Sequence, residues 1–439
     1  MRSLPLFQFS VAFLGLLAVA HSKKLTCKAR DLPAINVDGL QITDLHAEEY
    51  KEWSDWQHSP DQPFQAVIGP ISYCGITVTY THPGLNDSLN VYIGLPSSRD
   101  DWNGRYLGIG GGGWLAGWLD AIPGAISAGY VAAVTDGGHG ISFPEDVANA
   151  ESWSMRSKGN TDWNALQNFA SRSLDDMPKI AKQVIKGFYG EAAAHSYWVG
   201  CSTGGRQGLM SAQRYPENYD GIVAVAPAIN WASFLVAELW PQVLMNEAKY
   251  WPPPCEYEAI RQEALKACAE QVGTDAMGYD DCQFDALSIV GNSYDCVGSS
   301  RKISKQAAEL ANDIWQGPVR NGKQEWFGNM YQMPFGGYDD PSPFSGLAIT
   351  TCDENNRNCK GAPFVMSHSW AKDFLMRDLD WDIGGLNEEV FWKLLHASRN
   401  QYESIMSTND PDLSEFKARG GKIVGWHGKA PACCRRNLH

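Results

Sequence analysis

The feature that most constrains the fold is the alternation of short apolar runs with stretches of helical periodicity between residues 65 and 230. Strands built of near-continuous Val, Ile, Leu and aromatic residues, separated by helices, are typical of a mostly parallel sheet covered on both faces. The sequence therefore predicts an α/β fold. The apolar runs read SLNVYIGLP, GRYLGIGGGG, GYVAAVTDGG, SYWVGCS and GIVAVAPA, and the helical stretches read MPKIAKQVIKGFYG and GGRQGLMSAQRY.

The amino-acid composition and the pattern of predicted elements change after Ala228. Trp- and Pro-rich segments, a group of cysteines and helical pieces follow, and no further strand of the buried kind is predicted until GGKIVGWHG at residues 420–428. We interpret the intervening region as a lid inserted into the sheet domain, because the late strand resembles the earlier ones. A separate C-terminal domain is the alternative. The predicted division is a signal peptide (1–20), a sheet domain (21–228 and 401–430), a lid (229–400) and an atypical tail (431–439).

The N-terminus carries the pattern of a secretory signal peptide. Arg2 supplies a positive charge, residues 4–17 form an apolar run, and Ala18-Val19-Ala20 is a small-residue cleavage pattern. A membrane anchor is the alternative, but the run is shorter than the ~20 residues that a bilayer requires. We therefore expect a secreted, extracellular protein with no membrane partner, and the glycosylation sequon at Asn86 is compatible with this route.

Charge and cysteine content exclude some classes of partner and site. The formal net charge is -14, so nucleic acid and anionic membranes would repel the chain at long range. The 11 cysteines include no CxxC pair with the spacing of a zinc site, and we expect disulfides formed in an oxidising compartment. Because the number is odd, at least one cysteine has no partner within a monomer. Oligomeric state has no signal in the sequence.

Ser202 lies in GCSTG, residues 200–204, which matches the G-x-S-x-G pattern of serine hydrolases. Such a pentapeptide also arises by chance, so its context matters. Residues 197–200 have the pattern of a strand end, and a helical pattern follows until Pro216. A strand, a sharp glycine-flanked turn and a helix predict a nucleophile elbow, with the Ser202 hydroxyl at the carboxyl end of the sheet and a helix N-terminus pointing at it.

The glycine run GIGGGGW, residues 108–114, is a second candidate element. Acyl transfer needs two backbone N–H donors aimed at the developing oxyanion. We predict that Gly112 or Gly113 supplies one donor and Thr203 the other. A phosphate-binding loop or a plain flexible turn is the alternative, although the GK[ST] ending of a nucleotide-binding loop is missing.

Several segments form a pattern longer than any single motif: YWVGCSTGGRQGLMSAQRYPENYDGIVAVAPA, GIGGGGWLAG, VTDGGHG, GFYG and NDPDLSEFKARGGKIVGWHG. Together they resemble the fungal tannase and feruloyl esterase family. The resemblance implies an α/β-hydrolase fold with a large lid, no organic cofactor, and serine esterase chemistry on phenolic esters, such as gallates and ferulates of tannins or plant cell walls. It assigns Ser202 as the nucleophile, Thr203 as an oxyanion donor, and Cys201 as the cysteine that bridges to a partner beside the catalytic histidine.

The end of the sequence departs from the family pattern. In the family, a catalytic Asp follows the late strand in an HG-x-A-D pattern and a His-Cys pair comes much later, whereas Pro431 stands at the position of the Asp here. The resemblance therefore implies a hydrolase core truncated in its C-terminal part. Three interpretations follow: a hydrolase with a wrongly recorded C-terminus, a truncated inactive chain, and a protein that only binds aromatic esters. We favour the first, and expect full-length transcripts to restore an Asp at or next to position 431 and a downstream His-Cys pair.

Other residues are poor substitutes for the missing base and carboxylate. Asp410 and Asp412 precede the late strand and so lie at the wrong end of the sheet. His427 lies at the correct end, where we interpret it as a structural residue of the turn. His139, in TDGGHG, is expected to be structural or to face the substrate.

The resemblance also implies a pairing of cysteines, although sequence alone does not fix connectivity. The implied pairs are Cys27 with Cys74, Cys255 with Cys296, Cys268 with Cys282, and Cys352 with Cys359, which leaves Cys201, Cys433 and Cys434 outside them.

A calcium site in the lid is a further implication. Family members carry an acidic calcium loop after the cysteine that aligns with Cys268, and here only Glu270 and Asp275 fit its pattern. Because calcium takes about six to eight oxygen ligands, two acidic residues make the site questionable, and a solvated acidic loop is the alternative that we favour.

Overall fold

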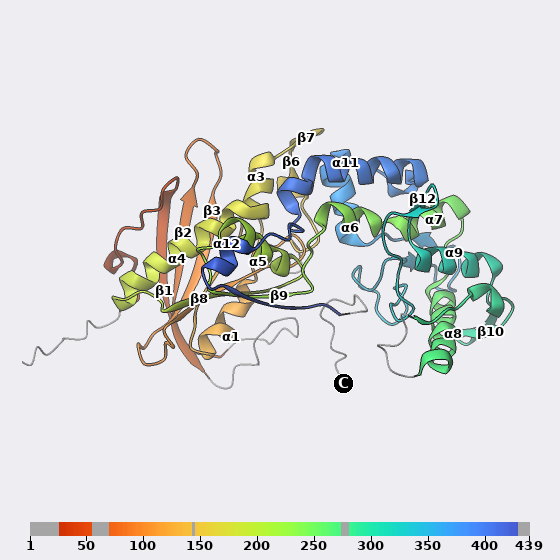
Figure 1. Cartoon of the computed structure of the whole chain (residues 1–439), viewed down its shortest axis with the longest axis horizontal. Helices are drawn as coiled ribbons and strands as arrows, with labels where there is room; N and C mark the ends of the chain where they lie inside the picture. Colours follow the sequence, from red (N-terminus) through yellow and green to blue (C-terminus); the bar gives the residue numbers. More distant parts are fainter. Residues whose placement is uncertain (1–25, 55–69, 143–144, 274–280, 429–439) are drawn as a thin grey trace, which may run out of the picture.

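A computed structural model of the chain describes residues 26–54, 70–142, 145–273 and 281–428. Its centre is an eight-stranded sheet with strand order β1-β2-β3-β5-β4-β8-β9-β16 (Figure 1). The strands from β5 to β16 in that order are mutually parallel. The bounds are β1 (Gln41–Trp53), β2 (Ile71–Thr81), β3 (Leu89–Pro96), β5 (Val131–Thr135), β4 (Arg105–Ile109), β8 (His195–Cys201), β9 (Gly221–Val225) and β16 (Lys422–Trp426).

The first three strands differ from the expectation of a mostly parallel sheet. Strand β2 is antiparallel to β1 and β3, and β3 is antiparallel to β5. For β2 and β3 the physical reason is their connection, which is too short for the crossover of a dozen or more residues that a parallel pair needs. The α/β prediction holds, but the sheet is mixed.

Along each central strand, successive side chains point to opposite faces of the sheet, so that each face carries an apolar layer. On β5, Val131 and Ala133 belong to the cluster that contains helix α4, whereas Ala132 and Val134 belong to the cluster that contains α1. Figure 1 accordingly shows α4 and α5 on one side of the sheet and α1 on the other. This period-two pattern is what a strand buried on both faces requires. The helices of this part are α1 (Ile122–Ser127), α2 (Glu151–Ser154), α3 (Trp163–Gln167), α4 (Ser173–Tyr189), α5 (Thr203–Arg214) and α12 (Ser414–Ala418).

Between β9 and β16 the chain forms a mainly helical region at the other end of the molecule (Figure 1). Helices α8 and α9 pack around one apolar cluster, and α6 and α11 contribute to a second cluster that includes side chains of the sheet domain. Strand β16 then pairs with β9, so the chain returns to the sheet beside the strand that it left. The helices are α6 (Trp231–Ala237), α7 (Trp240–Ala248), α8 (Pro254–Val272), α9 (Lys305–Gln316), α10 (Val365–Ser369) and α11 (Glu388–Met406), and the short strand pairs of the molecule are β6 (Met155–Ser157) with β7 (Asn160–Thr161), β10 (Ser293–Cys296) with β11 (Ser299–Lys302), β12 (Val319–Arg320) with β13 (Lys323–Gln324), and β14 (Thr350–Thr351) with β15 (Lys360–Gly361).

Four disulfides fix this architecture, and they are the four pairs that the family resemblance implies. One joins the N-terminal segment to β2, and three lie between β9 and β16. They are Cys27–Cys74, Cys255–Cys296, Cys268–Cys282 and Cys352–Cys359.

Strand β16 is more exposed than the sequence predicts. Ile423 packs against the core cluster that also contains Phe416 of α12, but Val424 and Trp426 on the opposite side are 58% and 56% exposed. No described element covers that side, so β16 is an exposed edge of the sheet within the described residues. Among the described helices, none has the length and apolar character needed to cross a membrane. The predicted signal peptide, Asp275, Pro431, Cys433 and Cys434 lie outside the described residues.

Candidate active site

Ser202 occupies a strained turn between β8 and α5. Its backbone has φ 58° and ψ -116°, a combination that costs a non-glycine residue on the order of 1–3 kcal/mol. The turn is held because the Ser202 N–H donates to the carbonyl of Val225, at the end of β9, at 3.0 Å. This is the geometry of the nucleophile elbow that the pentapeptide predicts.

Glycines make the elbow possible because backbone segments approach one another closely. A Cβ on Gly200 would lie 2.4 Å from the carbonyl carbon of Gly204, and a Cβ on Gly204 would lie 2.9 Å from the carbonyl oxygen of Gly111. Any larger residue at Gly200 would therefore push the start of α5 away from β8.

The glycine loop after β4 is fastened to the start of α5. The Gly204 N–H donates to Gly111 O at 3.0 Å, and the Thr203 hydroxyl donates to Gly113 O at 2.7 Å. From the next turn of the helix, the buried side chain of Gln207 accepts a hydrogen bond from Gly111 N–H at 3.0 Å. The two predicted oxyanion elements are thus brought together beside Ser202.

Three N–H groups of this junction are available to a ligand. Among the described residues, no acceptor receives a hydrogen bond from the N–H groups of Gly112, Gly113 or Thr203. Thr203 is the first residue of α5, where the N–H groups lack intrahelical partners and the helix dipole favours negative charge. An ester carbonyl oxygen that becomes an oxyanion finds there the environment that acyl transfer needs.

Arg206 fixes the nucleophile helix to three other parts of the chain. Its guanidinium, which is fully buried, donates to Phe169 O at 3.3 Å, to Ala170 O at 3.0 Å and to Met406 O at 3.4 Å, and it lies 5.5 Å from the ring centroid of Trp231. Burial lowers the pKa of Arg206 to about 9. The carbonyls come from a π-helical segment and from the C-terminus of α11, where backbone oxygens lack helical partners.

The structure places no base next to the Ser202 hydroxyl. Within the described residues, Ser202 Oγ has no hydrogen-bond partner. His139 is half-buried and stacks on Trp153 with ring centroids 4.3 Å apart, and desolvation of its ring lowers its pKa to about 4. His427 is exposed directly after β16, where Nδ1 lies 2.7 Å from Gly428 O. Asp410 and Asp412 are exposed ahead of β16.

The described residues do not by themselves form a calcium site. No group of three or more His, Cys, Asp or Glu side chains suited to a metal occurs among them. Glu270 is exposed near the end of α8. A single carboxylate does not meet the ligand number of calcium.

Arg206 and Gln207 are the functional residues that sequence reasoning missed. The signal was present in GGRQG, because two long polar residues stand between glycines and are followed by the small or apolar run at residues 208–212. Polar side chains that are buried in such a helix need partners, and buried polar groups are nearly always hydrogen-bonded.

Comparisons with known proteins agree with this geometry. Residues 74–434 match the family model described as tannase and feruloyl esterase. A probable feruloyl esterase of Arthroderma benhamiae is 37% identical over 376 residues, which are 85% of this chain and 66% of the relative. A tannase of Aspergillus oryzae is 28% identical over 82% of this chain and 66% of its own length. The chain thus spans just under two thirds of the length of these relatives.

Solved structures give the same fold. Tannin acyl hydrolase from Aspergillus niger superimposes with a TM-score of 0.77 at 26% identity, over 92% of this chain and 73% of that chain. Feruloyl esterase B from Aspergillus oryzae superimposes with a TM-score of 0.67 at 20% identity, over 90% of this chain and 72% of that chain. The fold is therefore that of an α/β hydrolase.

Proposed function

The chain belongs to the tannase and feruloyl esterase family, and on this basis we propose that it is a secreted serine esterase acting on esters of phenolic acids. The observation that carries the proposal is the elbow at Ser202, fastened through Thr203 and Gly204 to the glycine loop. Such a junction presents one hydroxyl and a set of backbone N–H donors at the same point, which is what acyl transfer requires.

In the proposed mechanism, Ser202 Oγ attacks the ester carbonyl and loses its proton to a base. The carbonyl oxygen becomes an oxyanion held by the N–H of Thr203 and by that of Gly112 or Gly113. Collapse of this intermediate releases the alcohol and leaves an acyl-enzyme, which water hydrolyses by the reverse sequence. We propose that the base and its orienting carboxylate lie outside the described residues, because none of the described histidines is bonded to Ser202.

An aromatic acyl group is supported by the surroundings of Gly112. A Cβ on Gly112 would lie 2.9 Å from the ring of Trp118, which is half-buried. An aromatic acid whose carbonyl oxygen reaches the N–H of Gly112 would therefore be within reach of this indole, and aromatic pairs prefer such offset or edge contacts. We propose that residues 229–400 act as a lid that completes the substrate site.

Secretion is part of the proposal and is supported by the disulfides. Four disulfides occur in the described residues, and such bonds persist in oxidising compartments. We propose small phenolic esters, free or attached to plant material, as substrates. Calcium binding stays a prediction that isothermal titration of the metal-free protein would test.

A serine-directed phosphonate label tests the nucleophile. The protein is purified from its source, its C-terminus is determined by mass spectrometry, and it is treated with a fluorophosphonate. We expect the label on Ser202, and the variant Ser202→Ala should stay unlabelled. Labelling of another serine would refute the assignment. No labelling together with retained binding of ferulate or gallate would instead favour a protein that only binds aromatic esters.

A further inference from the structure

A cleft lies in the helical region between β9 and β16, apart from the Ser202 junction. Its volume is about 390 Å³, within the range of roughly 300–1,000 Å³ that small-molecule sites occupy. Residues before α8, the β10–β11 hairpin and the turn before β15 line it. Figure 1 shows α8 and β10 at the end of the molecule opposite to β1. The cleft shares no residue with the Ser202 junction.

The walls of this cleft are covalently fixed. The disulfide Cys255–Cys296 joins the start of α8 to β10, and Cys352–Cys359 closes the loop that carries Asn356. Arg301 of β11 then fastens that loop to the hairpin, because its guanidinium donates to Asn356 O at 2.8 Å. A cleft built in this way is pre-formed, so a ligand does not have to order it.

Positive charge dominates the lining. Lys249, Arg301, Lys302 and Arg357 line the cleft, and Glu256 is the one carboxylate among its lining residues. Glu256 is buried, and its two oxygens accept hydrogen bonds from Ser304 N–H at 2.8 Å and Tyr250 Oη at 3.0 Å.

One acidic residue of the loop that carries Asn356 is also engaged within the protein. Asp353, on the loop closed by the second disulfide, accepts hydrogen bonds from the backbone N–H of Arg357 at 2.9 Å and from the side-chain amide of Asn358 at 2.8 Å. In a chain of net charge -14, four cations around one cleft form a local site for an anion.

The remaining lining residues favour a ligand that carries a ring next to its negatively charged group. Tyr250, Trp251 and Tyr294 supply aromatic surface, and Asn356 and Asn358 supply amides. The Trp251 indole N–H is buried and has no acceptor among the described residues. Aromatic faces bind flat rings and the C–H faces of sugars, whereas cations form charge-assisted hydrogen bonds with a carboxylate.

We propose that this cleft binds a carboxylate carried by a six-membered ring. Two sources share that chemistry: a uronic acid of a polysaccharide, and a free phenolic acid of the kind that the proposed esterase would release. In the first case the cleft anchors the protein to an acidic polysaccharide, and in the second it is a product-binding site. The binding itself does not depend on the activity of Ser202.

Calorimetry and saturation-transfer NMR on the intact protein test this proposal. The ligands are galacturonic acid and its trimer, ferulate and gallate, with galactose and ferulamide as uncharged counterparts and inorganic phosphate as an anion without a ring. We expect at least one acid to bind, and its uncharged counterpart to bind about tenfold or more weakly. Binding of galacturonates alone identifies the saccharide source, and binding of ferulate or gallate alone identifies the phenolic source.

Variants place the binding in the cleft. Lys302→Ala with Arg357→Ala should weaken binding about tenfold or more, because both cations line the cleft and are exposed. The control pair Lys266→Ala with Lys323→Ala removes the same charge from exposed positions of the same region, and it should bind as the wild type does. Equal binding of acids and uncharged counterparts, binding of phosphate alone, equal loss in both double variants, or no binding of any acid would overturn the proposal. Melting temperatures of both double variants confirm that they are folded.

Discussion

At the scale of single residues, local sequence predicts chemistry but not its distant partners. The elbow at Ser202 and its junction with the glycine loop were predictable, because Ser202, Thr203 and the loop occur in short motifs whose geometry is local. The role of Arg206 was not, since its acceptors at Phe169 and Met406 are 37 and 200 residues away along the chain. Those carbonyls become available only through a π-helical segment and a helix end, which no pattern around Arg206 reveals.

Arg206→Met should lower the free energy of unfolding by about 2–4 kcal/mol, because three buried carbonyls lose their donor. Arg214→Met, on the same helix, is the matched control. Arg214 makes an exposed hydrogen bond to Ser404 O, so its loss should cost less than about 1 kcal/mol. Urea unfolding followed by tryptophan fluorescence measures both. Equal effects of the two substitutions would show that Arg206 has no special role in joining α5 to α11.

Trp118→Leu should raise KM for an aromatic ester more than it lowers kcat, because the indole lies against Gly112 and would contact the acyl group. We expect a rise of roughly tenfold for methyl ferulate, with little change for an acetate ester. Trp163→Leu is the control, since Trp163 is 41% exposed and stacks on Tyr402 instead. A Trp118→Leu enzyme with unchanged preference between the two esters would contradict an acyl-binding role.

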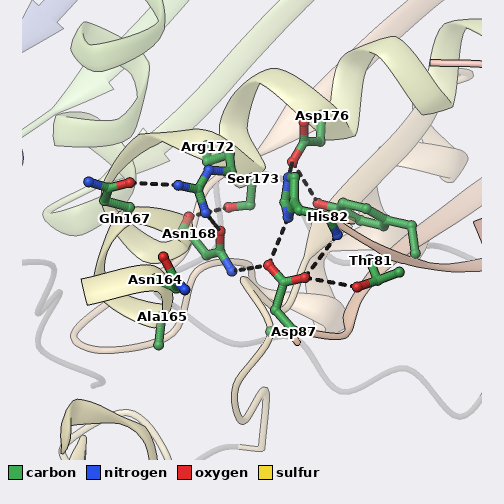
Figure 2. Close-up of polar contacts among 12 residues, drawn as sticks. Thr81, His82, Asp87, Asn164, Ala165, Gln167, Asn168, Arg172, Ser173 and Asp176 are labelled. Atoms are coloured by element: carbon green, nitrogen blue, oxygen red, sulfur yellow. Dashed lines mark hydrogen bonds and ion pairs between the residues drawn. The ribbon is translucent and has the colours of Figure 1, made fainter. Parts of the chain in front are cut away.

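At the scale of elements, irregular strands and buried polar networks could not be predicted from the sequence pattern. Strand β1 was not predicted, because register shifts after Ile42 and Tyr50 break the period-two alternation. A buried polar network that joins the residue after β2 to α4 is a second example. Figure 2 shows His82 between two carboxylates, with Nδ1 at 2.7 Å from Asp87 and Nε2 at 3.1 Å from Asp176. The three residues are separated by up to 94 positions, so only the fold brings them together.

This network predicts how stability depends on pH. Burial lowers the pKa of His82, but the hydrogen bonds to Asp176 and Asp87 outweigh it, and the net pKa is raised above 6.5. A raised folded pKa means that the contribution of His82 is fully present below pH 6.5 and is lost as the pH rises through the raised value.

The stability difference between the wild type and His82→Gln should therefore be largest near about pH 6 and should shrink at higher pH. Urea unfolding across this pH range measures it. His46→Gln, at an exposed position of β1, should leave the pH profile unchanged. A difference that grows as the pH rises would mean that His82 is neutral between the two carboxylates.

At the scale of the whole molecule, the chain folds as a sheet domain with a helical region between two neighbouring strands. The return to the sheet could be predicted, because GGKIVGWHG resembles the earlier strands, and β16 does pair with β9. Its exposure could not be predicted, because an edge strand and a central strand of a parallel sheet have similar compositions and differ only in what packs on them. A base and its carboxylate could not be placed in the same way, because no described histidine is bonded to Ser202.

The disulfide between Cys268 and Cys282 should stabilise the helical region. It closes a loop with a sequence separation of 14, for which chain entropy gives about 3 kcal/mol. Cys268→Ser with Cys282→Ser should lower the stability of this region by about that amount, measured by urea unfolding. Digestion without reductant should recover the two cysteines in one linked peptide. Free thiols at both positions would show that the bond does not form.

The measurement that tests the central claim most directly is the rate of hydrolysis of methyl ferulate and methyl gallate by the purified protein and by its Ser202→Ala variant. If Ser202 is the nucleophile of an esterase, at least one ester is hydrolysed by the wild type, and the variant loses on the order of 10⁴-fold or more in kcat while keeping the same melting temperature. Hydrolysis at an unchanged rate in a folded Ser202→Ala variant would contradict the account, because the elbow, the glycine loop and the N–H donors would then not be where the chemistry occurs.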